Sequence, residues 1–398
     1  MEEPLNRMLP FKEPSLKRDD LISVLDALAS RQVFPGKVYE NAIDILHEKL
    51  GVKNILLVSS KWIATQLVAQ VLVEEKVKNI YIANDSPLLY LNIFSTFAQK
   101  ILPLDITQYS LDFDVQSISL SDSLLFFTYN NGYSQDLSFI KSIDIPTMVD
   151  LSGSLFTRFQ NNYLFKDLDY VICSFKEEEV ITSGDGAAII IKDDKKFEKI
   201  RSLAYENNLL LCDFNCSLLI SQILKLNSIK NSRKKLFDAI CEKIPPFDDR
   251  FSSFDSRAIL YRDFIKQHDC NKNLIVEGGS ESYLNGNNNK LKFDEKKMKI
   301  DKNISLQNYK EELKDESSFT TFCIGVENIP LALQIAKSLE IEIRTAISKP
   351  VSLELKMMES FEKSEFIAKH AIMLPFYPSL KVENVNSIIT LINKILTY

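Results

Sequence analysis

Glycine is scarce in this chain. Ten glycines occur in 398 residues, about a third of the roughly 7% that is usual in proteins. Phosphate-binding loops rely on glycine because their backbone amides must approach the anion closely. The scarcity does not exclude such a loop, but it makes the remaining glycines informative. Two of them, Gly184 and Gly186, share one turn.

Other features are also missing. No run approaches the roughly 18 uncharged apolar residues of a membrane helix, and the acidic start MEEPLNRMLPFKEP lacks the apolar core of a signal peptide. The six cysteines show no tight pairing, which favours a reducing setting, and Cys212 and Cys216 have no histidine nearby. A net charge of −6 with interspersed signs argues against nucleic acid. The sequence therefore predicts a soluble, cytoplasmic protein without a membrane, nucleic-acid or metal partner.

Short apolar runs and helical patterns alternate between residues 53 and 206. Such repetition predicts a mainly parallel sheet with helices on both faces. We expect an initial strand and two helices from Pro10 to Leu50, and a long helical region from Asn208 to Ile244. The first of these helices carries an apolar series at helical spacing, namely Leu21, Val24, Leu25 and Leu28. The predicted strands cover 53–59, 79–83, 101–106, 123–129, 145–150, 170–173, 188–191, 319–326 and 340–346.

The turn with the two glycines lies between two buried strands and reads Ser174-Phe175-Lys176-Glu177-Glu178-Glu179-Val180-Ile181-Thr182-Ser183-Gly184-Asp185-Gly186-Ala187. It resembles the lysine loop of the DegT/DnrJ/StrS sugar aminotransferases, Ser-Phe-His-x-x-Lys-x-x-Thr-x-Gly-Glu-Gly-Gly. These are fold type I enzymes that use pyridoxal phosphate (PLP). The serine, phenylalanine, threonine and both glycines match, and Asp185 replaces a glutamate. Glu179 stands at the position of the Schiff-base lysine.

The resemblance extends to the phosphate site. The turn Ser59-Ser60-Lys61-Trp62 takes the place of the family's Ser-x-Gly-Thr, which holds the cofactor phosphate at a helix N-terminus. Lys61 replaces the glycine and could attract a phosphate as a point charge, whereas Trp62 would crowd the phosphate position. An ordinary strand-to-helix turn with an exposed lysine and a packed tryptophan is the alternative. By resemblance, Ser60, Lys61 and Trp62 are candidate cofactor-binding residues.

Further cofactor positions follow from the same resemblance. Asp150, at the end of a predicted strand, corresponds to the aspartate that binds the pyridine nitrogen and makes PLP an electron sink; alternatively it caps the next turn. Ser174 corresponds to a phosphate contact, and Asn208 to an asparagine that reaches the neighbouring subunit's phosphate. The ring-stacking aromatic residue is replaced near Pro87, and Tyr90 is one turn away.

Two more segments carry the resemblance. Tyr129 replaces a family histidine in His-x-x-Gly-x-x-x-Asp, while Gly132 and Asp136 are kept. The segment 371–380, followed by a predicted helix from Val382 to Leu396, is similar to the family's C-terminal Leu-Pro-x-x-Pro-x-Leu signature. Residues 245–317 have little pattern and fall where the family binds its sugar.

The resemblance implies an α/β protein with two domains. Residues 1–240 would form a three-layer αβα, fold type I PLP-transferase-like large domain with a mainly parallel sheet and N-terminal helices. Residues 241–398 would form a smaller C-terminal α+β domain. PLP or its amine form PMP is the cofactor that the family implies, and a homodimer, or a heterodimer with an active paralogue, is the implied assembly.

Three functions are compatible with these residues. A carboxylate cannot form a Schiff base, and Lys176 lies three residues too early, so the first is a non-transaminating binding or partner subunit in surface-polysaccharide or nucleotide-sugar metabolism. The second is an atypical PLP or PMP enzyme on a nucleotide-linked keto sugar, because the family's 3-dehydratases also lack the lysine; Glu179 would be its base. The third is a new activity of Glu177, Glu178 and Glu179 without PLP, although such glutamates are also typical of a solvated loop.

Overall fold

The structure is a computed structural model, and it describes residues 8–31, 33–105, 122–129, 137, 140–141, 143–159, 161–243, 318 and 320–396. The motif residues Gly132 and Asp136 and the segment 245–317 lie outside the described residues. Within these residues the chain forms a large sheet, a smaller second sheet and the helices that pack on them.

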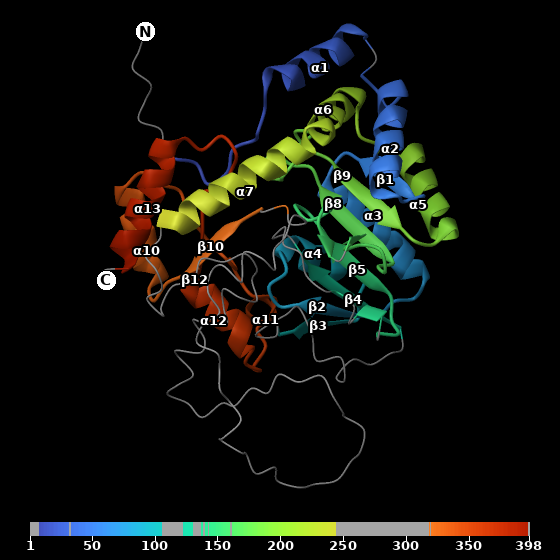
Figure 1. Ribbon diagram of the computed structural model, residues 1–398. Helices are drawn as coiled ribbons and strands as arrows, with labels where there is room; N and C mark the ends of the chain where they lie inside the picture. Colours follow the sequence, from blue (N-terminus) through green and yellow to red (C-terminus); the bar gives the residue numbers. More distant parts are fainter. Residues whose placement is uncertain are drawn as a thin grey trace.

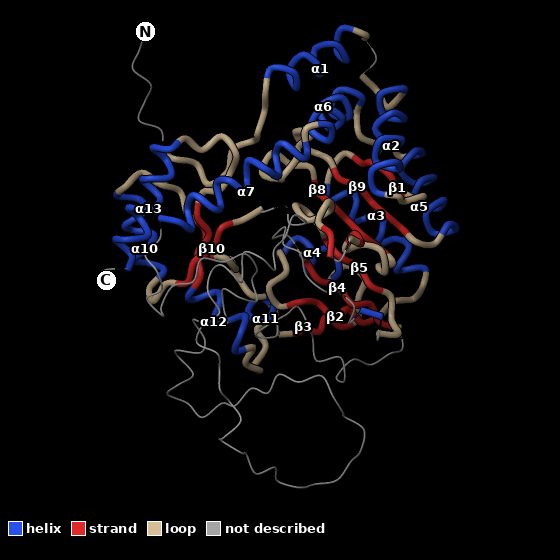
Figure 2. The backbone as a smooth tube through the Cα atoms, in the orientation of Figure 1, coloured by secondary structure: helices blue, strands red, loops and turns tan. Residues whose placement is uncertain are grey.

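The large sheet has seven strands in the order β3-β2-β4-β5-β8-β9-β1 (Figures 1 and 2). β9 is antiparallel to both of its neighbours, and the remaining strands run in one direction. The mainly parallel α/β fold predicted from the sequence is therefore confirmed. The strands are β1 Ile55–Val58, β2 Asn79–Ala83, β3 Lys100–Leu104, β4 Ser123–Thr128, β5 Thr147–Asp150, β8 Tyr170–Ser174 and β9 Ala187–Ile191.

Helices pack around this sheet (Figure 1). They are α1 Arg18–Ala29, α2 Lys37–Leu50, α3 Lys61–Glu74, α4 Leu88–Phe94, α5 Asp194–Glu206, α6 Asp213–Leu224 and α7 Leu226–Lys243. The helical region predicted from Asn208 to Ile244 is present, but it begins at Asp213 and consists of two helices. Asn208 has a φ of 54°, which no right-handed helix contains, and Lys225 separates α6 from α7.

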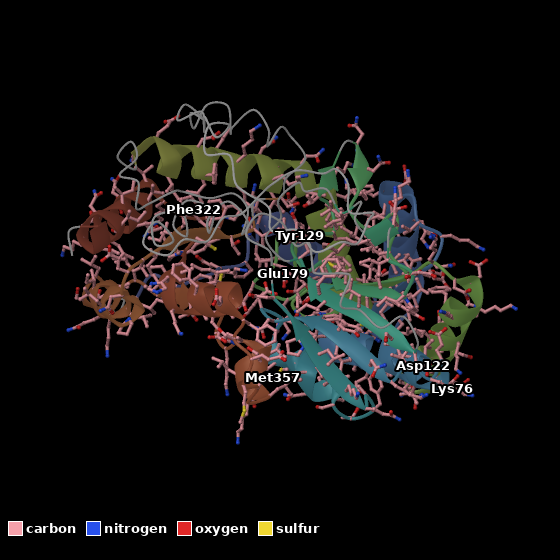
Figure 3. All side chains as sticks on the ribbon, turned by 90° about the horizontal axis from the view of Figure 1, so that it is seen from below. Lys76, Asp122, Tyr129, Glu179, Phe322 and Met357 are labelled. Atoms are coloured by element: carbon pink, nitrogen blue, oxygen red, sulfur yellow. The ribbon has the colours of Figure 1, made fainter. Side chains whose placement is uncertain are left out.

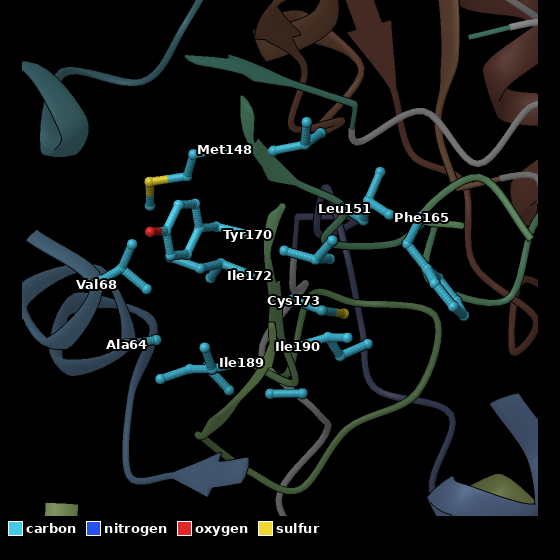
Figure 4. Packing of buried hydrophobic residues seen from close by; sticks show 14 of the residues in the cluster. Ala64, Val68, Met148, Leu151, Phe165, Tyr170, Ile172, Cys173, Ile189 and Ile190 are labelled. Carbon is cyan, nitrogen blue, oxygen red and sulfur yellow. The ribbon is translucent and has the colours of Figure 1, made fainter. Parts of the chain in front are cut away.

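The central strands are buried on both faces, which explains why they are continuous apolar runs and not alternating ones. Every residue of β4, β5, β8 and β9 is buried. In Figure 4, Ala64 and Val68 of α3 face one side of the pair β8–β9, and Leu151 and Phe165 lie on the other side. Tight packing on both sides fixes the strand ends, where the polar residues follow.

A second, three-stranded sheet has the order β10-β12-β11 and forms the C-terminal part. Its elements are β10 Phe322–Gly325, α10 Ile329–Ser338, β11 Arg344–Thr345, α11 Val351–Glu354, α12 Glu362–His370, β12 Ala371–Leu374 and α13 Val382–Leu396. A short hairpin, β6 Arg158–Phe159 and β7 Asn162–Tyr163, stands apart. The predicted initial strand is reduced to a single bridge between Leu9 and Ile341.

Helix α7 connects the two cores. Leu226 and Ile229 belong to the core of the large sheet, while Phe237 and Ile240 pack with the second sheet. The division of the chain at residue 240 stays a prediction. Among the described helices, none is long and apolar enough to cross a bilayer.

Helix α1 lies on α6 (Figure 1) and contacts it through polar side chains. Asp20 is fully buried and accepts hydrogen bonds from Ser221 Oγ at 2.6 Å and Lys225 Nζ at 2.9 Å. The three leucines of the apolar series that predicted the helix point away from the protein: Leu21, Leu25 and Leu28 are 57%, 62% and 45% exposed. Val24, the fourth member, is half-buried. An amphipathic helix normally buries its apolar side. In α1 the orientation is reversed, because leucines face solvent and a polar residue, Asp20, is buried against the rest of the chain.

The glycines of the lysine loop are required by backbone geometry. Gly186 has a φ of +124°, and a Cβ there would lie 2.7 Å from Leu211 Cδ1.

We expect Gly186→Ala to lower the free energy of unfolding by about 3 kcal/mol, from backbone strain and overpacking together. Gly51→Ala is the matched control, because Gly51 also has positive φ, +66°, but no atom within 4 Å of the added Cβ. Urea denaturation should give it a loss of only about 1 kcal/mol; equal losses would contradict the role of the clash.

Candidate functional site

The carboxyl ends of parallel strands meet at one edge of a sheet, where α/β proteins bind their ligands. At this edge Asp150 ends β5, Ser174 ends β8, and Lys61 begins α3 directly after β1. The structure therefore brings together three residues that the sequence singled out, although they are up to 113 positions apart (174 − 61).

Asp150 is the centre of this group and has donors on both oxygens. Oδ2 accepts from Tyr90 Oη at 2.6 Å and from Lys61 Nζ at 3.1 Å. Oδ1 accepts from the backbone N–H of Ser152 at 2.8 Å and from the Ser152 hydroxyl. The bond to Ser152 N–H is the turn cap that the sequence left open as the alternative for Asp150. We call Asp150, Lys61, Tyr90 and Ser152 the Asp150 network.

The network is buried and charged. The Asp150 side chain is fully buried and the Lys61 side chain is only 15% exposed. Burial raises the pKa of Asp150, but the Lys61 ammonium and the hydroxyl donors outweigh it and hold that pKa below its usual value. Burial likewise opposes the charge on Lys61, and the carboxylates of Asp150 and Glu179 outweigh it, so the pKa of Lys61 is raised. Both groups are thus held in their charged forms.

The turn before α3 orients Lys61 inward and Trp62 outward. Ser60 is the N-cap of α3, and its Oγ accepts from Ile63 N–H at 3.2 Å. Trp62 is 52% exposed, so the alternative prediction of an exposed lysine and a packed tryptophan is wrong. Successive helical residues point about 100° apart, at 3.6 residues per turn, so an inward Lys61 turns Trp62 toward solvent. The predicted crowding of the phosphate position by Trp62 is therefore not seen, because this side chain points to solvent.

The lysine loop is held by its own hydrogen bonds. Thr182 Oγ1 donates to Phe175 O at 3.0 Å and accepts from Gly184 N–H at 2.9 Å. Glu179 N–H donates to Lys176 O at 3.1 Å. Lys176, in the same loop, is an exposed residue. In Figure 3, Glu179 and Tyr129 lie in the middle of the molecule, between the large sheet and the C-terminal helices.

Glu179 shares its surroundings with a second lysine. Desolvation raises the pKa of Glu179, and the ammonium groups of Lys12 and Lys61 only partly offset it. Desolvation lowers the pKa of Lys12, against the attraction of Glu179. Nothing in the sequence pattern pointed to Lys12, because the N-terminal segment reaches this place only through the tertiary fold. The neighbouring Glu178 is paired with Arg344 at 3.1 Å.

The remaining predicted site residues have structural partners. Ser174 N–H donates to Ser152 Oγ at 2.9 Å, and Ser174 Oγ accepts from Lys176 N–H at 3.2 Å. Asn208 is exposed and ends α5 in the left-handed conformation. Its contact with a neighbouring subunit stays a prediction. Tyr90 was considered only as a displaced stacking residue; its fully buried ring packs 4.3 Å from Phe126.

Comparison with known proteins identifies the fold of the chain. No protein-family model matches the chain. A transaminase of Campylobacter jejuni, UDP-4-amino-4,6-dideoxy-N-acetyl-beta-L-altrosamine transaminase, is 23% identical over 273 residues, which cover 60% of this chain and 71% of that protein. The aminotransferase TlmJ from Streptoalloteichus hindustanus has a TM-score of 0.77 at 13% identity, with 98% of this chain and 99% of that one covered.

Two further solved structures share the fold. A DegT DnrJ EryC1 StrS aminotransferase from Brucella abortus has a TM-score of 0.71 at 12% identity, covering 94% and 95% of the two chains. The E. coli GDP-4-keto-6-deoxy-D-mannose-3-dehydratase, with bound hydrated PLP, has a TM-score of 0.72 at 13% identity, covering 96% and 98%.

The chain has the fold of the fold type I PLP-dependent aminotransferases, over nearly its whole length. Within this class, the resemblance to the DegT/DnrJ/StrS sugar aminotransferases, indicated by the loop around Glu179, is confirmed.

The described residues do not fit PLP or PMP held in that family's manner. The aspartate that would face the pyridine nitrogen already receives Lys61 and Tyr90 on one oxygen and Ser152 on the other. Glu179 offers a carboxylate where an amine is needed. In the described part of the chain, no group of three or more His, Cys, Asp and Glu side chains is arranged to hold a metal ion.

Proposed function

We propose that this chain is a non-transaminating relative of the nucleotide-sugar aminotransferases. It serves as a binding or partner subunit in the cytoplasmic metabolism of nucleotide-linked amino sugars for surface polysaccharides. The observation that carries the proposal is Glu179 at the position of the Schiff-base lysine, in a loop that keeps the family's serine, phenylalanine, threonine and two glycines. The C. jejuni relative, a transaminase of a UDP-linked amino sugar, supports the substrate class.

The surroundings of Glu179 support the loss of transamination. Transamination needs a neutral amine at the cofactor carbonyl. Lys176 is an exposed residue, and its backbone N–H donates a hydrogen bond to Ser174 Oγ. Lys61 is bonded to Asp150, at the end of the site where the pyridine nitrogen would lie.

Glu179→Lys alone should not restore activity. The new lysine would supply an amine, but the Asp150 network would still occupy the ring-nitrogen position. We expect no aldimine absorbance after addition of PLP and no amino-sugar product from a UDP-linked keto sugar. Wild type and Glu179→Gln serve as controls. An aldimine band in Glu179→Lys would contradict the role given to the network, and amino-sugar formation by the wild type would refute the proposed function.

A lysine-independent enzyme of the 3-dehydratase kind is the second candidate. It is favoured by the outward orientation of Trp62, which is 52% exposed and therefore does not fill the phosphate position beside Ser60. A solved dehydratase has the same fold. The Lys61–Asp150 pair opposes this candidate. Titration with PMP, followed by thermal denaturation, separates the two: a ligand that binds the native state raises the melting temperature, and only the second candidate predicts a rise for the wild type.

A dimer is part of the proposal. The reversed helix α1 presents Leu21, Leu25 and Leu28 to solvent, and nearby Phe34 is 79% exposed. Exposed apolar groups that form a continuous surface are typical of protein interfaces. A second copy of this chain, or an active paralogue with a complementary apolar surface, would cover them.

A further inference from the structure

We propose that the Lys61 ammonium is a built-in replacement for the cofactor's ring nitrogen. On this view the chain supplies from its own sequence the cation that Asp150 would otherwise take from a bound pyridine ring. The site is then complete without PLP or PMP. The inference rests on the proposed function and deepens it, since it explains why Asp150 is retained in a subunit that does not transaminate.

The geometry gives Lys61 the place of a ligand. Its Nζ lies 3.1 Å from Asp150 Oδ2 and 5.9 Å from the centre of the Tyr90 ring. The same ring stands beside Phe126 and its hydroxyl donates to the same carboxylate oxygen. The ammonium is thus held by a carboxylate and by an aromatic face, the two groups that a protonated pyridine ring would also use.

Charge makes the two cations mutually exclusive. Asp150 carries one negative charge in a fully buried position, and a buried charge needs one close partner of opposite sign. A pyridinium beside Lys61 would place two cations on one carboxylate, in surroundings where like charges repel strongly. Removal of the lysine would leave the carboxylate without its cation, and a ring cation could then enter.

Lys225 provides a matched comparison within the chain. It also pairs with a fully buried aspartate, Asp20, at 2.9 Å, and its side chain is 21% exposed. This pair joins α1 to α6 and α7 and has no counterpart in a cofactor site. A substitution at Lys225 therefore measures what the loss of any such lysine does to the fold.

The test is a PMP titration of four full-length proteins: wild type, Lys61→Met, Lys61→Met/Asp150→Asn and Lys225→Met. Binding is followed by PMP fluorescence and by the shift in melting temperature. We expect Lys61→Met to bind PMP at least tenfold more tightly than wild type, because its carboxylate lacks a cation. The double variant should lose that gain, since the amide carries no charge, and Lys225→Met should bind no better than wild type.

Stability is the second readout, in case Lys61→Met is too unstable for titration. The unpaired Asp150 would then be the cause, so Lys61→Met/Asp150→Asn should melt at a higher temperature than Lys61→Met. Wild type that binds PMP as tightly as Lys61→Met would overturn the inference, as would a double variant that is no more stable and binds equally well. A double variant that behaves like Lys61→Met would leave the proposed function intact. Tight PMP binding by the wild type would also favour the dehydratase-like second candidate, and the assay for amino-sugar formation by the wild type tests the proposed function separately.

Discussion

Replacing Asp150 by alanine should lower the free energy of unfolding by about 3–5 kcal/mol, the usual cost of removing one partner of a buried ion pair. The loss is large because Lys61 would keep its charge at a position where only 15% of its side chain reaches solvent. The hydroxyls of Tyr90 and Ser152 would also lose their common acceptor. Urea denaturation followed by circular dichroism measures the change.

Asp194→Ala is the control for this prediction. Asp194 also pairs with a lysine, Lys53, but the two side chains are 61% and 76% exposed. Exposed pairs contribute about 0–1 kcal/mol, so the control should remain close to wild type. Similar losses in Asp150→Ala and Asp194→Ala would mean that the Asp150 network adds little to the fold.

The dependence on pH follows from the directions of the two shifts. The pKa of Asp150 is lowered in the folded protein, so its contribution is complete above about pH 3.9, the unfolded value, and is lost as the pH falls through the folded pKa. The pKa of Lys61 is raised, so its contribution is complete below about pH 10.4 and is lost as the pH rises through the folded pKa. Between pH 5 and 9 these two groups should therefore contribute a constant amount to the free energy of unfolding of the wild type.

The sequence predicted the sheet because its strands are short runs of apolar residues, such as Ile55–Val58 and Ala187–Ile191, flanked by turns. Burial on both faces leaves that signal in local composition. The Asp150 network leaves no such signal. Its residues come from separate elements: Tyr90 is 60 residues and Lys61 is 89 residues from Asp150 in the sequence. Only the side-by-side order of the strands brings them together.

From the sequence, Lys61 replaces a phosphate-loop glycine, and its side chain is expected either to attract a phosphate as a point charge or to lie exposed. Neither expectation places its ammonium group on Asp150. The apolar pattern of the sequence predicts a helix from Ile63 to Glu75, whereas α3 begins at Lys61 with Ser60 as N-cap. Two residues decide the outcome, because the first helical position points toward Asp150 and the next points to solvent. A helix start two residues earlier would have indicated an inward lysine and an outward Trp62.

Helix α1 illustrates the opposite case, in which the local pattern is correct and its surroundings are missing. The spacing of Leu21, Leu25 and Leu28 predicted a helix, and the helix forms. Its contacts with α6 include polar ones: besides Asp20, Ser23 Oγ lies 2.7 Å from Ser217 Oγ on α6. The one apolar residue of α1 that is buried is the small Ala27. An apolar stripe that the chain itself does not cover indicates a surface for another chain.

Leu25→Asp should weaken the proposed dimer by about thirtyfold, which corresponds to about 2 kcal/mol, the loss typical of a central apolar contact. Leu25 is 62% exposed in the single chain, so a charge there is tolerated by the monomer and excluded only from an apolar interface. Sedimentation equilibrium over a range of protein concentrations measures the dissociation constant.

Met358→Asp is the control, because Met358 is fully exposed and follows α11 in the C-terminal part, away from α1 (Figure 1). It should dimerise like wild type, and both variants should keep the wild-type melting profile of the monomer. Loss of folding in Leu25→Asp would show that the stripe is packed within the chain and not between chains. A wild type that stays monomeric at high concentration would contradict the homodimer. The stripe would then have to be covered by a different subunit, and co-expression with an active paralogue would be the form in which α1 is buried.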